Sequence, residues 1–346
     1  MPSPTNNFSN NFLSATPAPK HHYWLAVIGV LTWLILVGVL LYNRQSIIDW
    51  FRLLGYVPPN AVITLANDDT MTPYTRHLFY LNRPQLLTSV TSFRLHCPED
   101  ENTIVLGCYH PDQDGIFIYA VTDPTLYGVQ QVTAAHEVLH AVYARLTSAQ
   151  RTQLDNELVA YDRHGLTSPL VKAEVKLYEK TEPNSVYDEM SCTFGTEIAD
   201  LPAGLNNYYK KYFYNRQAIV AYENHYQGEF ASRENIIASD DTQLMSWKAD
   251  INSLEALLKT LLMSLNAQSA SLNGLRISGN IAAYNQGVST YNSAVDSYNE
   301  KVKQIQALIS QYNQLVDSRN QVAGQLSVLA GALDTRITET TKPLTP

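Results

Sequence analysis

The feature that most constrains the fold is a heptad pattern that runs through residues 240–334. Apolar side chains recur there at alternating steps of three and four residues, and the dipeptide Tyr-Asn returns at positions 284, 291, 298 and 312. This spacing places one apolar stripe along a long helix and is typical of a coiled coil. The segment 276–280 interrupts the pattern. We therefore expect a long antiparallel coiled-coil hairpin that bends there, with arms of roughly 50 to 75 Å.

A second segment constrains where the chain resides. Residues 23–42 contain no charged side chain and have the length that a bilayer-spanning helix needs. Tyr23, Trp24 and Tyr42 lie at its ends, where aromatic side chains favour the membrane interface. The run is longer than the apolar core of a signal peptide, and no small-residue cleavage motif follows it. We expect an uncleaved transmembrane helix, preceded by a disordered tail (1–22) and followed by an amphipathic juxtamembrane segment (43–59).

Charge and cysteine content exclude some classes of protein. The net charge of −8 provides no basic surface for nucleic acid, so no nucleic-acid partner is expected. The three cysteines are too few for a disulfide scaffold. Cys97 and Cys108 flank a turn-rich stretch, and they can form a disulfide in an oxidising compartment or stay as two free thiols. The sequence leaves both alternatives open.

Residues 60–235 have the pattern of a mixed globular domain. Strands are predicted at 61–65, 103–109 and 115–121, with turn residues at 110–114 between the last two. Residues 71–87 are expected to be partly helical, and helices are predicted over 129–146, 148–164, 168–180, 185–199 and 204–232. The fold class is therefore α+β, mostly helical with a small sheet. The transmembrane helix precedes this domain, the hairpin follows it, and a loose tail covers 335–346.

The pentapeptide His136-Glu-Val-Leu-His140 carries the strongest chemical signal. Positions i and i+4 of a helix share a face, so the two imidazoles can bind one Zn2+ ion. Glu137 can then act as the catalytic general base on a water at the open metal position. The flanking residues suit a helix, because no proline or glycine occurs between Val129 and Leu146. The alternative is a chance match on a core helix whose histidines are satisfied by hydrogen bonds.

A catalytic zinc of this kind needs a third protein ligand. The helix predicted over 185–199 offers Glu189, which we predict to be that ligand. Glu197 lies two turns further on the same face and is predicted to orient an imidazole N–H. For each of the two, the alternative is a solvated carboxylate on a helix. Cys192 could also approach the metal, and its alternative is a small buried thiol.

These residues resemble the zincin metallopeptidases of the gluzincin type, in which HExxH lies on one helix and a glutamate ligand on a later one. The sequence VTAAHEVLHAVYARL, with LGCY upstream and FGTE downstream, is similar to bacterial membrane-anchored proteins. The resemblance covers roughly residues 60–235. It implies a zincin-like domain with zinc on His136, His140 and Glu189 and with Glu137 as the base.

The same resemblance implies that residues 115–121 form the edge strand that pairs with an extended substrate. One position departs from the family pattern. Many gluzincins carry an aspartate four residues after the glutamate ligand, where it supports a histidine, but Thr193 occupies that position here. Support for the histidine must then come from Glu197 or elsewhere.

The oxyanion of a tetrahedral intermediate also needs a stabilising partner. The residues of suitable chemistry near the predicted ligand helix are Tyr187, Tyr208, Tyr209, Arg216 and His225. The sequence does not choose among them.

The expected function is that of a membrane-anchored zinc-dependent metallopeptidase that hydrolyses peptide bonds. The alternative is a non-enzymatic, membrane-tethered scaffold that acts through its coiled-coil hairpin. The expected partners are a peptide or protein substrate, the membrane through 23–42, and either another protein or a second copy through 240–334. The distribution of Lys and Arg does not settle the orientation of the single-pass chain. The Cys97 and Cys108 pair favours an extracytoplasmic catalytic domain on a bacterial cell membrane.

Overall fold

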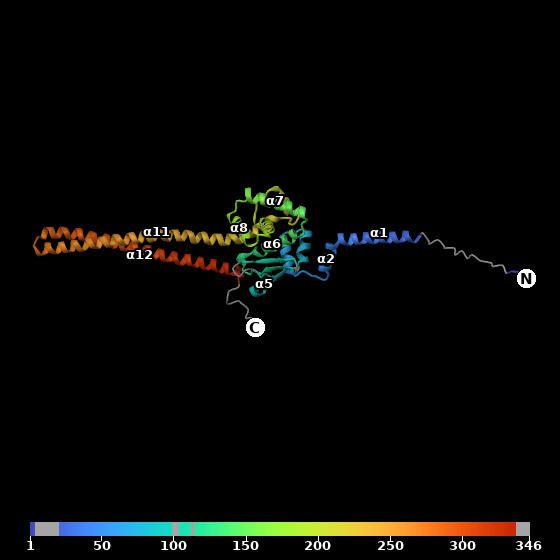
Figure 1. Cartoon of the computed structure of the whole chain (residues 1–346). Helices are drawn as coiled ribbons and strands as arrows, with labels where there is room; N and C mark the ends of the chain where they lie inside the picture. Colours follow the sequence, from blue (N-terminus) through green and yellow to red (C-terminus); the bar gives the residue numbers. More distant parts are fainter. Residues whose placement is uncertain (4–20, 99–103, 112–114, 337–346) are drawn as a thin grey trace. The chain divides into compact units, whose positions relative to one another are not determined.

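The structure is a computed structural model that describes residues 1–3, 21–98, 104–111 and 115–336 (Figure 1). It is mostly helical with one small sheet, as the sequence predicts. The chain divides into two compact units, residues 1–57 and 58–346. Most of the predicted disordered tail, residues 4–20, lies outside the described residues.

The first unit contains two helices, α1 (His21–Tyr42) and α2 (Arg44–Leu53). The segment Trp24–Tyr42 of α1 has a mean hydropathy of 2.6, and none of it is buried within the chain. Its length and composition therefore suit a membrane span. In α2 the rings of Trp50 and Phe51 are exposed and make an edge contact with centroids 4.9 Å apart, whereas Asp49 is buried. The predicted amphipathic juxtamembrane segment (43–59) is thus helical over Arg44–Leu53.

The second unit contains, in chain order, α3 (Asn60–Asp68), α4 (Pro73–Leu81), β1 (Gln85–Leu87), α5 (Val90–His96), β2 (Gly107–His110), β3 (Gly115–Tyr119), η1 (Pro124–Leu126), α6 (Val129–Ala144), α7 (Ser148–His164), α8 (Pro169–Thr181), α9 (Val186–Glu197), α10 (Ala203–Tyr209), α11 (Arg216–Ile277) and α12 (Ile281–Leu333). The strand predicted at 61–65 is wrong, because these residues belong to α3. Its β-branched side chains suggested a strand, but Val62, Leu65 and Ala66 are buried at helical spacing after Pro59, which precedes the helix.

The sheet has the strand order β1-β3-β2. Strands β2 and β3 form the predicted antiparallel pair, in which Gly107 lies opposite Ile118 and His110 opposite Gly115. The turn residues 112–114 lie outside the described residues. The prediction that 115–121 is the edge strand is wrong, because β1 pairs with the other side of β3 and leaves β2 at the edge. This pairing joins segments far apart in the chain, so no local pattern reveals it.

Helix α6 lies at the centre of the second unit and packs against α4, α9, α11 and strand β2. It is buried on nearly every side. The buried positions of α6 are Val129, Gln131, Val132, Thr133, Ala134, Ala135, Glu137, Val138, Leu139, Ala141, Val142 and Tyr143. The pentapeptide is therefore held in a rigid, close-packed environment rather than on a surface helix.

The helices after α6 agree with the predicted ranges, with one exception. Helix α7 begins with a capping box in which Thr147 and Gln150 bond each other's backbone N–H groups. The helix predicted over 204–232 is instead divided between α10 and α11. The division arises because residues 210–215 pair with another part of the backbone: Thr72 N–H donates to Tyr212 O, and Tyr214 N–H donates to Thr70 O.

Helices α11 and α12 pack along each other as an antiparallel hairpin (Figure 1). Two contacts define the register: Arg319 makes two hydrogen bonds to Asp241, and Leu272 packs against Gly287 nearer the turn. We call residues 240–333 of this hairpin the arm. Helix α11 continues unbroken from Arg216 through residues 235–240, so the arm is a direct extension of a helix in the globular part.

The tail predicted as loose over 335–346 is not loose at its start. Thr335 is fully buried, because the chain after α12 packs against the segment that precedes β2. Residues 337–346 lie outside the described residues.

Candidate metal centre

Two imidazoles and one carboxyl group project from the middle of α6. The rings of His136 and His140 are one turn apart, and their centroids are separated by 5.0 Å. Glu137 lies between them in sequence and is 5% exposed. Because α6 is packed on all sides, these three side chains have little freedom to move away from the site.

Helix α9 supplies the third donor, Glu189. The helix can approach α6 closely because position 195 is a glycine: a Cβ there would lie 2.7 Å from Leu139 Cδ1 and 2.7 Å from Tyr209 Cε1. Glu189 then faces both histidines with one carboxylate. Its Oε2 lies 3.5 Å from His136 Nε2, and its Oε1 lies 3.5 Å from His140 Nε2.

These distances and the chemistry of the donor set fit a zinc ion. Zinc binds imidazole nitrogen and carboxylate oxygen at about 2.0 to 2.2 Å, so neighbouring ligand atoms in a tetrahedral site are roughly 3.3 to 3.5 Å apart. The observed separations of 3.5 Å match this spacing. Two histidines and one glutamate leave a fourth position for water or substrate. His136, His140 and Glu189 are thus brought together as the sequence predicts.

Asp188, which the sequence reasoning missed, orients one of the imidazoles. Its Oδ1 lies 2.9 Å from His140 Nδ1. A hydrogen bond from Nδ1–H to a carboxylate fixes the tautomer and leaves Nε2 free as a ligand. The sequence feature that could have revealed Asp188 is the adjacent pair Asp188-Glu189 at the start of a helix. Neighbouring helical residues point in different directions, so two such carboxylates can reach opposite edges of one imidazole ring.

Glu197 lies in a different environment from the one predicted. It shares a hydrogen bond with Glu174 on α8, and Glu223 on α11 lies nearby. Burial, followed by the charges of these carboxylates, raises the pKa of Glu197 well above its usual value. At His140, the orienting role predicted for Glu197 belongs to Asp188. Glu197 instead joins a buried group of carboxyl groups on three helices, in which Glu223 accepts a hydrogen bond from the Tyr226 hydroxyl.

Cys192 is a near neighbour of the site, and its thiol competes with Glu189 for the role of third ligand. Ligand atoms of His136, His140 and Cys192 lie within 4.8 Å of one another. The Cys192 thiol lies 3.9 Å from Asp188 Oδ1, the atom that contacts His140 Nδ1, and it shares a hydrogen bond with His140. Burial also raises the pKa of this thiol to about 12. The geometry favours Glu189 as the third ligand, because its carboxylate faces the Nε2 atoms of both histidines.

Glu137 is held in a buried, close-packed position. Burial raises the pKa of Glu137 to about 7, although the charges of His140 and His136 oppose the shift. Strand β2 contributes to this packing at Gly107, where a Cβ would lie 2.6 Å from Glu137 Oε1 and 2.5 Å from Thr133 Cγ2. Only glycine lets the strand come this close. The sequence signal was a glycine inside the strand predicted at 103–109, where it often marks a close approach.

The imidazoles hold protons readily when no metal is bound. Burial lowers the pKa of His136, but the hydrogen bond with Glu189 helps to bring it above its usual value. Burial also lowers the pKa of His140, but the neighbouring Cys192 and Asp188 raise it well above that value. Because zinc binds only deprotonated imidazole nitrogen, metal binding at this site must release protons.

The residues considered for the oxyanion role have varied surroundings. Arg216 donates to the backbone carbonyls of Gly195, Ile198 and Ala199, so it stabilises the end of α9. The Tyr209 hydroxyl donates to Ser191 O at 2.6 Å. The remaining candidates are Tyr208, whose ring makes edge contacts with Tyr209 and Tyr212, and the exposed Tyr187 and His225. Arg216 and Tyr209 are thus engaged in holding α9, which leaves the oxyanion partner unassigned.

An open pocket of about 420 Å³ adjoins the site at Asp188. Its lining includes Tyr143 and Asp155, which share a hydrogen bond of 2.8 Å, and Arg151, whose guanidinium lies 4.8 Å from the centre of the Tyr143 ring. The pocket therefore offers aromatic and charged groups to a ligand side chain close to the histidines.

No family model matches this chain, and no curated protein or solved structure shows significant similarity to it. The fit of this site to a zinc ion therefore rests on the geometry of the chain's own residues. The strongest element of that geometry is the pair of 3.5 Å distances between the histidines and Glu189.

Proposed function

We propose that this chain is a membrane-anchored, zinc-dependent metallopeptidase with a zincin-like domain. One observation carries the proposal: the Nε2 atoms of His136 and His140 both face the carboxylate of Glu189, at distances that suit ligands of one zinc ion. The buried Glu137 beside them supplies a general base. Helix α1 provides the anchor, since it is long and apolar enough to cross a membrane.

Each residue of the site has a defined task in peptide hydrolysis. A zinc ion held by His136, His140 and Glu189 would polarise the scissile carbonyl and lower the pKa of the attacking water. Glu137 removes a proton from that water as its oxygen attacks the carbonyl carbon. The same carboxyl group then gives the proton to the leaving nitrogen, so that one water and one amide yield a carboxylic acid and an amine. A pKa of about 7 suits a group that must accept and then donate a proton near neutral pH.

Strand β2 is the best candidate for binding the substrate backbone. It is the edge strand of the described sheet on the side next to α6, and edge strands can pair with an extended peptide. Because Gly107 of β2 lies against Glu137, a peptide paired along β2 would place its scissile bond near the base. We therefore assign the pairing with an extended substrate to β2 instead of residues 115–121.

The disulfide between Cys97 and Cys108 favours an extracytoplasmic catalytic domain, because disulfides persist in oxidising compartments. The arm offers a long helical surface that could bind another protein or a second copy of this chain. This role is independent of whether the chain is an enzyme. If the zinc proposal fails, the membrane-tethered scaffold becomes the better account.

Zinc content of the full chain, purified in detergent, tests the ligand assignment. We expect about one zinc per chain in the wild type and loss of zinc in Glu189→Ala. Glu197→Ala is the matched control, since it makes the same change on the same helix and should keep the metal. A well-folded wild type without zinc would contradict the proposal, and zinc retained by Glu189→Ala would contradict the ligand set.

Peptidase activity tests the role of the base. Glu137→Gln should retain zinc and lose activity on a library of unstructured peptides by a factor of at least about 100, because the amide cannot accept the proton. If the variant cleaves peptides as fast as the wild type, Glu137 is not the base.

A further inference from the structure

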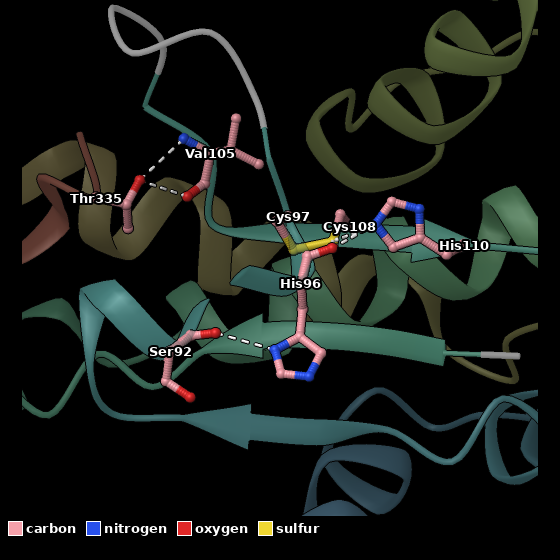
Figure 2. The surroundings of a disulfide bond; sticks show 7 residues. All are labelled: Ser92, His96, Cys97, Val105, Cys108, His110 and Thr335. Carbon is pink, nitrogen blue, oxygen red and sulfur yellow. Dashed lines mark hydrogen bonds between the residues drawn. A yellow bond between two sulfur atoms is a disulfide. The ribbon is translucent and has the colours of Figure 1, made fainter. Parts of the chain in front are cut away.

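The chain returns from the arm directly onto the segment that leads into β2. Thr335 lies two residues beyond the end of α12, and its hydroxyl donates to Val105 O at 2.7 Å and accepts from Val105 N–H at 3.2 Å (Figure 2). The carbonyl oxygen of Thr335 accepts from Arg94 Nε at 2.8 Å. Thr335 is fully buried. One side chain thus satisfies both backbone groups of Val105, although the two residues are 230 positions apart in the sequence.

A disulfide holds β2 on the other side of Gly107. Cys108 is bonded to Cys97, which follows α5, so that the strand is tied to that helix (Figure 2). Only Leu106 and Gly107 lie between the residue that Thr335 holds and the residue that the disulfide holds. The position of Gly107 relative to α6 is therefore set from both directions along the strand.

The end of α12 also contacts the start of the helix that carries the histidines. Leu329 is buried in one cluster with Val121, Leu126 and Val129, and Val129 is the first residue of α6. Leu106 packs against the same cluster. The base of the arm therefore contacts both sides of the interface between α6 and β2.

We propose that Thr335, just beyond the end of the arm, is a positioning residue of the metal centre, because it holds Val105 and thereby the approach of β2 to Glu137. The inference rests on the proposed peptidase function. Gly107 touches Glu137 and Thr133 so closely that a small displacement of β2 changes the surroundings of the base.

Hydrogen exchange of the full chain tests the positioning without relying on activity. Thr335→Val keeps the shape of the side chain but leaves the N–H and C=O of Val105 without their partner. We expect exchange of the amides in 105–110 to accelerate at least tenfold. Thr335→Ser keeps the hydroxyl and should restore the wild-type rate. Thr290→Val, the same substitution on an exposed position of α12, is the matched control and should change nothing.

Kinetics then test the coupling to the site. With zinc content unchanged, Thr335→Val should lower kcat/KM at least fivefold, and Thr335→Ser should restore it. If Thr335→Val fails to fold, Leu329→Val gives the same readouts, because it loosens the arm end of the cluster that holds Leu106. Unchanged exchange, or faster exchange with unchanged kcat/KM, would overturn the inference. If the chain shows no peptidase activity at all, the proposed function is wrong. The hydrogen-exchange result would still decide whether Thr335 positions β2.

Discussion

Two neighbouring carboxylates, Asp188 and Glu189, contact opposite edges of the same imidazole. Asp188 Oδ1 lies 2.9 Å from His140 Nδ1, and Glu189 Oε1 lies 3.5 Å from His140 Nε2. The first contact fixes the orientation of the ring, and the second presents a ligand atom beside it. Several titratable groups are thereby buried together, and such an arrangement is unfavourable unless the charges are paired or bind a metal.

The buried carboxyl group of Glu137 makes the stability of the metal-free protein depend on pH. Its pKa is about 7 in the folded chain, compared with 4.5 for an ordinary glutamate side chain. Between these values the folded chain holds a proton that the unfolded chain has lost, so the free energy of unfolding falls as the pH rises from about 4.5 to 7. Over this pH range the free energy of unfolding falls by about 3 kcal/mol.

Glu137→Gln should remove this contribution, because the amide does not ionise. In the presence of a chelator, denaturant unfolding should show the variant to be about 3 kcal/mol more stable than the wild type at pH 8 and nearly equal to it at pH 4. Two stability curves that run parallel from pH 4 to pH 8 would contradict the prediction.

At the scale of elements, two glycines determine how closely helix α9 and strand β2 pack against α6. Gly195 lets α9 pack against Leu139, which brings Glu189 to the histidines, and Gly107 lets β2 pack against Glu137. The site is therefore a junction of one strand and two helices, and its geometry depends on interelement distances that a single methyl group would change.

Gly107→Ala should push β2 away from α6, since the new methyl group would lie within 2.6 Å of Glu137 Oε1. We expect a loss of about 1 to 3 kcal/mol in the free energy of unfolding, together with at least a tenfold fall in kcat/KM at unchanged zinc content. Gly228→Ala, on α11 with nothing within 4 Å of the new methyl group, is the control and should be neutral or slightly stabilising. Equal effects of the two substitutions on kcat/KM would show that the closeness of β2 to Glu137 is unimportant.

At the scale of the whole molecule, the arm is continuous with the globular part. Helix α11 begins with Arg216, Ile219 and Val220 buried against the core, and the same helix then extends into the arm. Its partner α12 returns to the core at Leu329. Helix α11 thus packs against α6 and α9, which carry the site, and α12 ends against the first residue of α6.

The side of the membrane on which the second unit resides can be tested through its cysteines. If that side is oxidising, alkylation of the denatured chain without reductant should modify only Cys192, and alkylation after reduction should modify Cys97 and Cys108 as well. Cys192→Ser should show no modification before reduction. Modification of all three cysteines without reductant, in chain taken rapidly from its native membrane, would place the unit in a reducing compartment.

Local patterns predicted much of the helical structure. The uncharged run became α1, the heptads became α11 and α12, and the helix that carries His136 and His140 begins at the predicted residue. Each of these signals arises within a few turns of chain, where helical spacing alone decides which side chains share a face. The strand predicted at 61–65 failed because β-branched residues are compatible with both structures, and the packing of Val62, Leu65 and Ala66 selected the helix.

The sequence by itself determined the residues of the site that are close along the chain, because the five-residue motif needs only one helix to bring two imidazoles together. The sequence also pointed to Glu189, but only the tertiary structure decided that Asp188 meets His140 and that Glu197 lies in a separate acidic group. It also decided that β2 rather than β3 is the edge strand and that Thr335 holds Val105. These contacts depend on how distant segments pack, and packing is a property of the whole fold that no periodicity within one segment can specify.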